Sequence, residues 1–134
     1  MAQVIFSAKG ENHDSDGNPD LMTYMPGGLN VGGGWNDSST FKAPEKGFYF
    51  FSITCVRNAI NTGGTEDDVR ILLRRNGTDV GFAWCGQGSG ARSTGAYSVA
   101  VKLNQNDRIE TFADSDGGRR RVFGIYQFSG FLIR

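Results

Sequence analysis

Apolar and polar residues alternate in short runs along the chain, and glycine, asparagine or aspartate residues separate these runs. An alternation with a period of two is typical of β-strands that have one buried face. No segment of ten or more residues has the spacing of apolar positions that predicts a helix. The pattern predicts strands within residues 3–8, 47–56, 97–103, 108–114 and 122–134, and a hairpin over 69–85.

The segment 47–56, "GFYFFSITCV", has the strongest strand pattern. The residues of one face are all apolar, namely Tyr49, Phe51, Ile53 and Cys55. The residues of the other face are mixed, namely Phe48, Phe50, Ser52, Thr54 and Val56. A strand that is apolar on one face and partly apolar on the other is covered on both sides. We expect the second cover to be another subunit.

The hairpin within 69–85 is centred on Asn76-Gly77, which suits a two-residue type I′ turn because both residues accept a positive φ. Counting outward from this turn pairs apolar residues on one face, namely Leu73 with Val80, Ile71 with Phe82, and Val69 with Trp84. The other face pairs Arg74 with Asp79, and Arg70 with Ala83. This register places Phe82 and Trp84 in the core.

The two cysteines, Cys55 and Cys85, fall on different faces in this register. Cys55 lies on the core face of its strand, whereas Cys85 follows Trp84 and points outward. A disulfide requires Cα atoms about 5.5 Å apart and side chains that face each other. We therefore expect two free thiols, with Cys55 a small buried apolar residue.

Length and composition indicate one all-β domain over residues 1–134. The chain has 20 glycines, 10 phenylalanines and only 3 prolines, as expected of many short strands joined by glycine-containing turns. About ten short antiparallel strands in a domain of this size predict a β-sandwich or barrel. The apolar closing segment, 122–134, should lie in the middle of a sheet, hydrogen-bonded on both edges.

The charge balance argues against nucleic acid as a partner, because 14 basic residues match 14 acidic residues and the formal net charge is zero. No stretch reaches the roughly 20 apolar residues that a membrane-spanning helix needs, so we expect no membrane insertion. The opening residues, "MAQVIFSAKG", become polar too soon for a signal peptide.

Catalytic chemistry is not expected, because the chain contains one histidine, His13, and no nucleophile elbow, phosphate loop or CxxC spacing. We expect His13 to be a solvated loop residue. Calcium is the one candidate cofactor, with Asp114 and Asp116 as ligands and a further group at Asp14, Asp16 and Asp20. Neither loop has the downstream glutamate of an EF-hand, so solvated turn acids are the expected alternative.

Several segments, in order from Phe6 to the end of the chain, resemble the complement C1q globular head domain. Residues 40–51, "TFKAPEKGFYFF", resemble its signature of a Phe followed by Gly-x-Tyr-x-Phe, with Asn30 and Trp35 upstream. Residues 72–77, 101–109 and 128–133 resemble its hairpin, its strand with a polar turn, and its terminal strand. The spacing from Trp35 to Phe41 is one residue shorter than is common, and Ile53 stands where an aromatic residue is frequent. The sequence has no collagen-like stalk before the domain, and in this it resembles the stand-alone heads of invertebrate and some bacterial proteins.

The resemblance implies a ten-stranded antiparallel jelly-roll sandwich that assembles as a compact homotrimer and is secreted. Phe50, with Phe48 and Ala100, is the candidate trimer contact. Some members of the family bridge the position of Cys85 to the preceding strand, but residues 69–75 contain no cysteine. Others hold calcium near the trimer axis through acids in a loop that here, over 86–95, has no Asp or Glu.

Invertebrate members of the family are often lectin-like pattern-recognition proteins of innate immunity, which bind glycans or microbial surface molecules. The resemblance therefore implies carbohydrate binding by loops, with sialic acid or other acidic glycans as candidate ligands. An aromatic platform and arginine forks suit such ligands. The candidate ligand residues are Arg92, Asp116, Arg119, Arg120 and Trp35. The alternative is a structural trimerisation head, or a module that binds another protein, such as a bacterial surface or spore component.

Overall fold

The computed structural model describes residues 3–15, 19–57, 69–85, 93–115 and 120–134. Within these ranges every regular element is a β-strand, so none of them offers a helix that could span a bilayer. The strands are β1 (Ile5–Ser15), β2 (Asp20–Leu21), β3 (Leu29–Val31), β4 (Thr40–Lys42), β5 (Gly47–Arg57), β6 (Val69–Arg75), β7 (Thr78–Trp84), β8 (Ser93–Leu103), β9 (Arg108–Ser115) and β10 (Arg120–Leu132).

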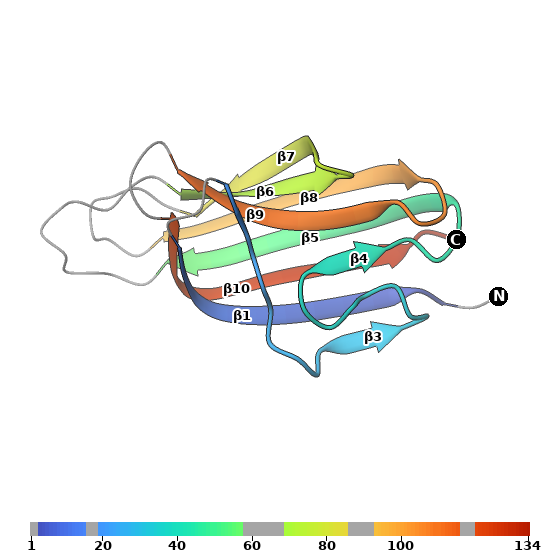
Figure 1. The fold of residues 1–134 in the computed structure, drawn as a ribbon, viewed down its shortest axis with the longest axis horizontal. Coiled ribbons are helices and arrows are strands. Elements are labelled where there is room, and N and C mark those ends of the chain that lie inside the picture. Colours follow the sequence, from blue (N-terminus) through green and yellow to red (C-terminus); the bar gives the residue numbers. More distant parts are fainter. Residues whose placement is uncertain (1–2, 16–18, 58–68, 86–92, 116–119) are drawn as a thin grey trace, which may run out of the picture.

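The strands form two antiparallel sheets that pack face to face, as Figure 1 shows. We call them the β10 sheet, with strand order β3-β1-β10-β5-β8, and the β9 sheet, with order β2-β9-β6-β7 and β4 also paired to β9. The predicted all-β sandwich is confirmed.

The closing strand lies in the middle of the β10 sheet, as the sequence predicted. β10 pairs with β1 on one edge and with β5 on the other. Phe128 sits opposite Ala8 of β1 and Ile53 of β5, and its side chain is fully buried. The apolar character of this segment follows from its central position, because its inward side chains contribute to the core.

Aromatic rings fill the space between the sheets around Phe6. The Phe6 ring stacks on Trp35 and on Phe41, with ring centroids 4.9 Å apart in each pair, and meets the edge of Phe128 at 4.9 Å. Phe51 of β5 extends the cluster. Offset-stacked and edge-to-face arrangements are the favourable geometries for aromatic pairs. The predicted core face of β5 is confirmed, since Tyr49, Phe51, Ile53 and Cys55 are all buried.

The β6–β7 hairpin has the predicted turn but not the predicted register throughout. Asn76 and Gly77 both have a positive φ, and Arg74 pairs with Asp79 as expected. Beyond this pair the register shifts, because Val80 is an extra residue on β7 and Leu73 pairs with Gly81. Such a β-bulge reverses the facing of every later side chain on its strand.

The bulge corrects the predicted positions of the last β7 residues. Ala83, not Phe82, lies opposite Ile71, and Trp84 lies opposite Arg70. Phe82 and Trp84 are therefore outside the core, 39% and 46% exposed, and the prediction that they are buried was wrong.

The same shift turns Cys85 inward, where it forms a disulfide with Cys55. The Cα atoms of Cys55 and Cys85 are 5.7 Å apart, within the range for a bridge. The expectation of two free thiols was wrong, because it rested on an unbroken hairpin register. The disulfide joins β5 of one sheet to the end of β7 of the other.

Candidate binding surfaces on the two outer faces

An apolar row crosses the outer face of the β10 sheet. It takes one residue from each strand in turn, and these are Val31, Ile5, Phe131, Phe50 and Ala100. The rings of Phe50 and Phe131 lie 5.5 Å apart, and Phe131 is 43% exposed. Because these side chains point away from the core, the row lies at the surface of the described part of the chain, with Val31 and Phe131 each 43% exposed.

More apolar side chains extend this row towards one end of the sheet. Phe48 is 58% exposed, and its carbonyl oxygen accepts a hydrogen bond from the backbone N–H of the exposed Ile133 at 2.8 Å. The neighbouring row on the other side is polar across β1, β10, β5 and β8, with Ser7, Ser129, Ser52 and Ser98, and ends at the exposed Leu29 on the edge strand β3. The apolar area is therefore bounded, and it contains the predicted trimer contacts Phe48, Phe50 and Ala100. We call it the apolar face.

The outer face of the β9 sheet has a different composition. Three adjacent transverse rows on it are Trp84–Arg70–Asp114, Phe82–Leu72–Phe112–Leu21, and Asp79–Arg74–Glu110–Thr40, and Arg108 and Lys42 pair beyond the last of them. Ion pairs join Arg70 to Asp114 and Arg74 to Asp79, each with an N–O distance of 2.7 Å. The middle row is apolar and the outer rows are charged. We call this surface the aromatic–arginine face.

Trp84 and Phe82 form an exposed corner on this face. Their ring centroids are 5.5 Å apart and their planes are nearly perpendicular, at 84°. The guanidinium carbon of Arg70 lies 5.1 Å from the Phe82 centroid and 5.9 Å from the Trp84 centroid. Cation–π attraction to both rings, together with the pair to Asp114, fixes the position of Arg70.

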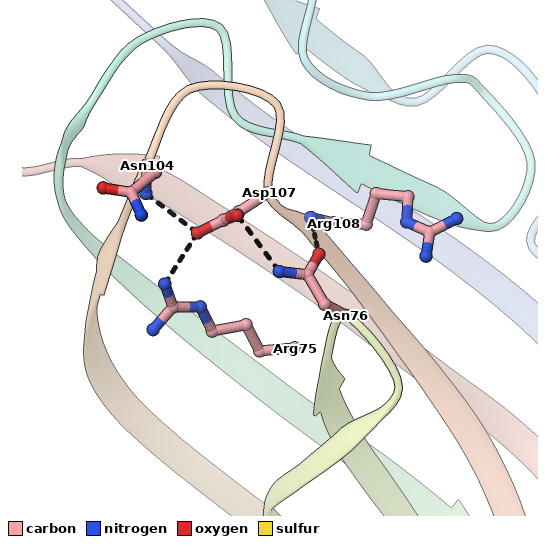
Figure 2. Close-up of polar contacts among 5 residues, drawn as sticks. All are labelled: Arg75, Asn76, Asn104, Asp107 and Arg108. Carbon is pink, nitrogen blue, oxygen red and sulfur yellow. Dashed lines mark hydrogen bonds and ion pairs between the residues drawn. The ribbon is translucent and has the colours of Figure 1, made fainter.

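A polar cluster joins the turn between β6 and β7 to the turn between β8 and β9, as Figure 2 shows. Asp107 accepts hydrogen bonds from Arg75 Nη2 at 2.7 Å, Asn76 Nδ2 at 3.0 Å and the Asn104 backbone N–H at 2.8 Å. The Asn76 side chain also accepts from the Arg108 backbone N–H at 2.9 Å. The hydrogen bond from Asn76, with those from Asn104 and Arg75, lowers the pKa of Asp107 below its usual value. This cluster holds the β6–β7 turn against the β8–β9 turn.

Comparison with known proteins tests the resemblance. No family model matches the chain. Among solved structures, the globular domain of zebrafish complement 1qA protein superposes with a TM-score of 0.72 at 14% identity, over 98% of both chains. Murine APRIL at pH 8.5 gives 0.68 at 12% identity, over 99% of this chain and 100% of the other. Eiger TNF from S. frugiperda gives 0.67 at 11% identity, over 100% of this chain and 94% of the other.

The chain has the C1q/TNF-like fold. The predicted resemblance to the C1q head and the predicted jelly-roll sandwich are therefore confirmed at the level of fold. Sequence identities this low establish fold alone, because one fold hosts many functions.

The predicted ligand residues of this C1q/TNF-like chain are placed only in part. Arg92, Asp116 and Arg119 lie outside the described residues. Arg120 begins β10, where its backbone pairs with Ser15. Trp35 is 3% exposed and stacked on Phe6, so its ring has no free face for a sugar in this structure.

The candidate calcium ligands are placed in part as well. Asp114 is paired with Arg70, and Asp20 Oδ2 lies 2.6 Å from His13 Nε2. Asp14 lies on β1, and Asp16 is outside the described residues. Within the described ranges no three His, Cys, Asp or Glu side chains gather to hold a metal. The expectation that His13 is a solvated loop residue was wrong, since its side chain is 9% exposed and lies on β1.

The exposed pair Phe82 and Trp84 was missed because period-two alternation cannot show where a strand gains a residue. One signal could have located the bulge. Gly81 stands inside a strand, and an isolated glycine there often marks a bulge. A second signal was the pair of cysteines, because a bridge to Cys55 requires Cys85 to point inward.

Proposed function

We propose that this chain is a non-enzymatic, extracellular recognition head that acts as a homotrimer and binds carbohydrates. The observation that carries the proposal is the apolar face, where Phe48, Phe50 and Phe131 lie together on the outer side of the β10 sheet. Exposed apolar areas of this kind mark interaction surfaces. The sequence alone predicted that this face of β5, which carries Phe48 and Phe50, contacts another subunit.

A second copy of the chain is the occupant that the composition of this face supports. The apolar face carries aromatic residues at its centre and has a row of serines along its edge, including Ser52 and Ser98. An aromatic core with a polar rim is the usual anatomy of a protein–protein interface. Trimeric assembly is what the resemblance to C1q heads implies.

The disulfide between Cys55 and Cys85 supports an extracellular location. Disulfides form and persist in oxidising compartments and are rare in the cytosol. Both cysteines of the chain are used in this bridge. Secretion, as opposed to display on a surface, follows from the resemblance to C1q heads.

Carbohydrate recognition is the finer part of the proposal. The candidates from the sequence, Arg92, Asp116, Arg119 and Arg120, carry guanidinium and carboxylate groups, and binding residues are often found on loops that a rigid scaffold positions. Arginine forks suit the carboxylate of an acidic sugar. A structural trimerisation head without a small ligand is the alternative, and the apolar face supports it equally.

Light scattering on the purified protein tests the assembly. We expect a trimer at micromolar concentration, and dissociation on Phe50→Asp, because the substitution buries an unpaired charge. Thr78→Asp is the matched control, since it adds the same charge to an exposed position of the β9 sheet. A monomeric wild-type protein, or a Phe50→Asp variant that stays trimeric, would contradict this interface.

A glycan array probed with and without calcium tests the ligand. Multivalency should make even a millimolar single-site affinity detectable. Selective binding supports recognition, and loss of binding on chelation would support calcium. A trimer that binds no glycan would favour the structural alternative.

A further inference from the structure

We propose that the aromatic–arginine face binds a neutral sugar ring, with Trp84 as the stacking platform and the Arg70–Asp114 pair as the group that bonds its hydroxyls. The proposal rests on the carbohydrate recognition proposed above and gives it a second site, on a sheet face and not in the loops.

The platform is exposed and held rigidly. Trp84 and Phe82 are 46% and 39% exposed, side by side on β7. The residue after Trp84 is Cys85, which the disulfide ties to β5. The Cys85 backbone N–H also donates to the Val69 carbonyl at 2.8 Å. A site built on an anchored strand keeps its geometry better than one on a loop.

The chemistry of this corner matches the two surfaces of a pyranose. The C–H groups on one face of a sugar ring are apolar and weakly positive, so they pack on the negative face of an aromatic ring. Arg70 Nε and Nη2 both bond to Oδ2 of Asp114, at 2.8 and 2.7 Å. This leaves the remaining guanidinium N–H groups as donors and Asp114 Oδ1 as an acceptor towards vicinal hydroxyls.

The charges on this face favour a neutral ligand over an acidic one. The three rows around this corner contain two arginines, both ion-paired, against three carboxylates, which are those of Asp79, Glu110 and Asp114. The exposed cations Arg108 and Lys42 form the next row, beyond Glu110 and three rows from Asp114, so among the described residues of the three rows an acidic sugar beside Trp84 would meet no unpaired cation. A protein partner fits less well, because the apolar row from Phe82 to Leu21 is one residue wide and has charged rows on both sides.

Tryptophan fluorescence provides a direct test, because the chain has only two tryptophans and they differ in exposure. Trp35 is 3% exposed and Trp84 is 46% exposed, so a neutral quencher such as acrylamide should act mainly on Trp84. We expect methyl galactoside, glucoside or mannoside, titrated through the millimolar range, to reduce acrylamide quenching of Trp84 in the wild-type protein until the effect saturates. The methyl glycoside of N-acetylneuraminic acid is the acidic comparison and should protect less at equal concentration. Trp84→Phe should remove the protected signal, because only the buried Trp35 remains.

Substitutions on the glycan array locate the site. Trp84→Ala and Arg70→Gln should weaken binding of neutral glycans at least tenfold. Arg74→Gln is the matched control, because Arg74 lies on the same face of β6 and is also ion-paired, but lies over Phe112. It should bind as the wild type does.

The outcomes separate this site from the general function. Neutral-glycan binding that Trp84→Ala and Arg70→Gln leave unchanged overturns this site while carbohydrate recognition stands. A wild-type trimer that binds no glycan and shows no quencher protection overturns both. Stronger protection by the methyl glycoside of N-acetylneuraminic acid than by the neutral glycosides overturns the assignment of a neutral ligand.

Discussion

The backbone carbonyl of Trp84 occupies the space that a side chain on Gly95 would need. Gly95 lies on β8 opposite Cys55, and a β-carbon built there would collide with the Trp84 carbonyl oxygen and carbon. It would also come 3.2 Å from the Cys55 sulfur. The close approach of β7 and β8 beside the disulfide therefore depends on a residue without a side chain.

We predict that Gly95→Ala destabilises the protein by about 3 kcal/mol, the upper end of the cost of overpacking, because the obstructing atoms belong to the backbone. The measurement is chemical denaturation of the purified variant. Ala96→Ser, at the exposed neighbouring position, should change stability by less than about 0.5 kcal/mol. Equal stability of Gly95→Ala and the wild type would contradict this packing.

Removing the disulfide should cost about 3–4 kcal/mol, because the bridge closes a segment with a sequence separation of 30 residues. The comparison is denaturant unfolding of the wild type and of the Cys55→Ala/Cys85→Ala double variant. The wild type with added reductant should approach the double variant. Titration of two free thiols in the unfolded, unreduced wild type would refute the bridge.

Tyr24 and Thr111 should show strong energetic coupling. The two hydroxyl oxygens are 2.7 Å apart, and both side chains are buried. Tyr24→Phe or Thr111→Val should each cost about 1–3 kcal/mol, since each leaves a buried hydroxyl without its partner. The double variant should cost less than the two single losses combined, which a double-mutant cycle measures. Additive losses would mean that the two hydroxyls do not interact.

Acid should weaken the fold through Asp107. Its hydrogen bonds lower its pKa in the folded state, so its contribution to stability is fully present above the unfolded-state pKa. That contribution is lost as the pH falls through the lower, folded-state value. We predict that stability measured from about pH 5 down to about pH 3 falls less steeply in Asp107→Asn than in the wild type. Asn76→Ala, which removes one of the donors, should give an intermediate slope, and an unchanged slope in both variants would contradict the assignment.

Regular alternation predicted much of this fold. The two faces of β5 and the central place of β10 were predictable from the alternation of side chains along each strand, because every side chain that points into the core had to be apolar. The Asn76-Gly77 turn was predictable because few residue pairs accept a positive φ at both positions. The sandwich architecture follows once short antiparallel strands are the only elements.

The candidate site was less predictable, since it depends on the single extra residue at Val80. β7 presents apolar side chains to the core in either register. These are Phe82 and Trp84 in the unbroken register and Ala83 in the observed one. Alternation therefore fits both registers. The sequence offered Trp35 as a candidate ligand residue and could not show its burial, because packing on Phe6 requires contacts that are distant along the chain.

The central position of β10 has a consequence for how the protein is made. β10 is the last of the described strands to be synthesised, yet it fills the gap between β1 and β5. While the chain emerges from the ribosome, those two earlier strands have unpaired edges, which are sites for mispairing with other chains. The β10 sheet is therefore completed only after all the other described strands have been translated, and until then the nascent chain is a candidate client for chaperones.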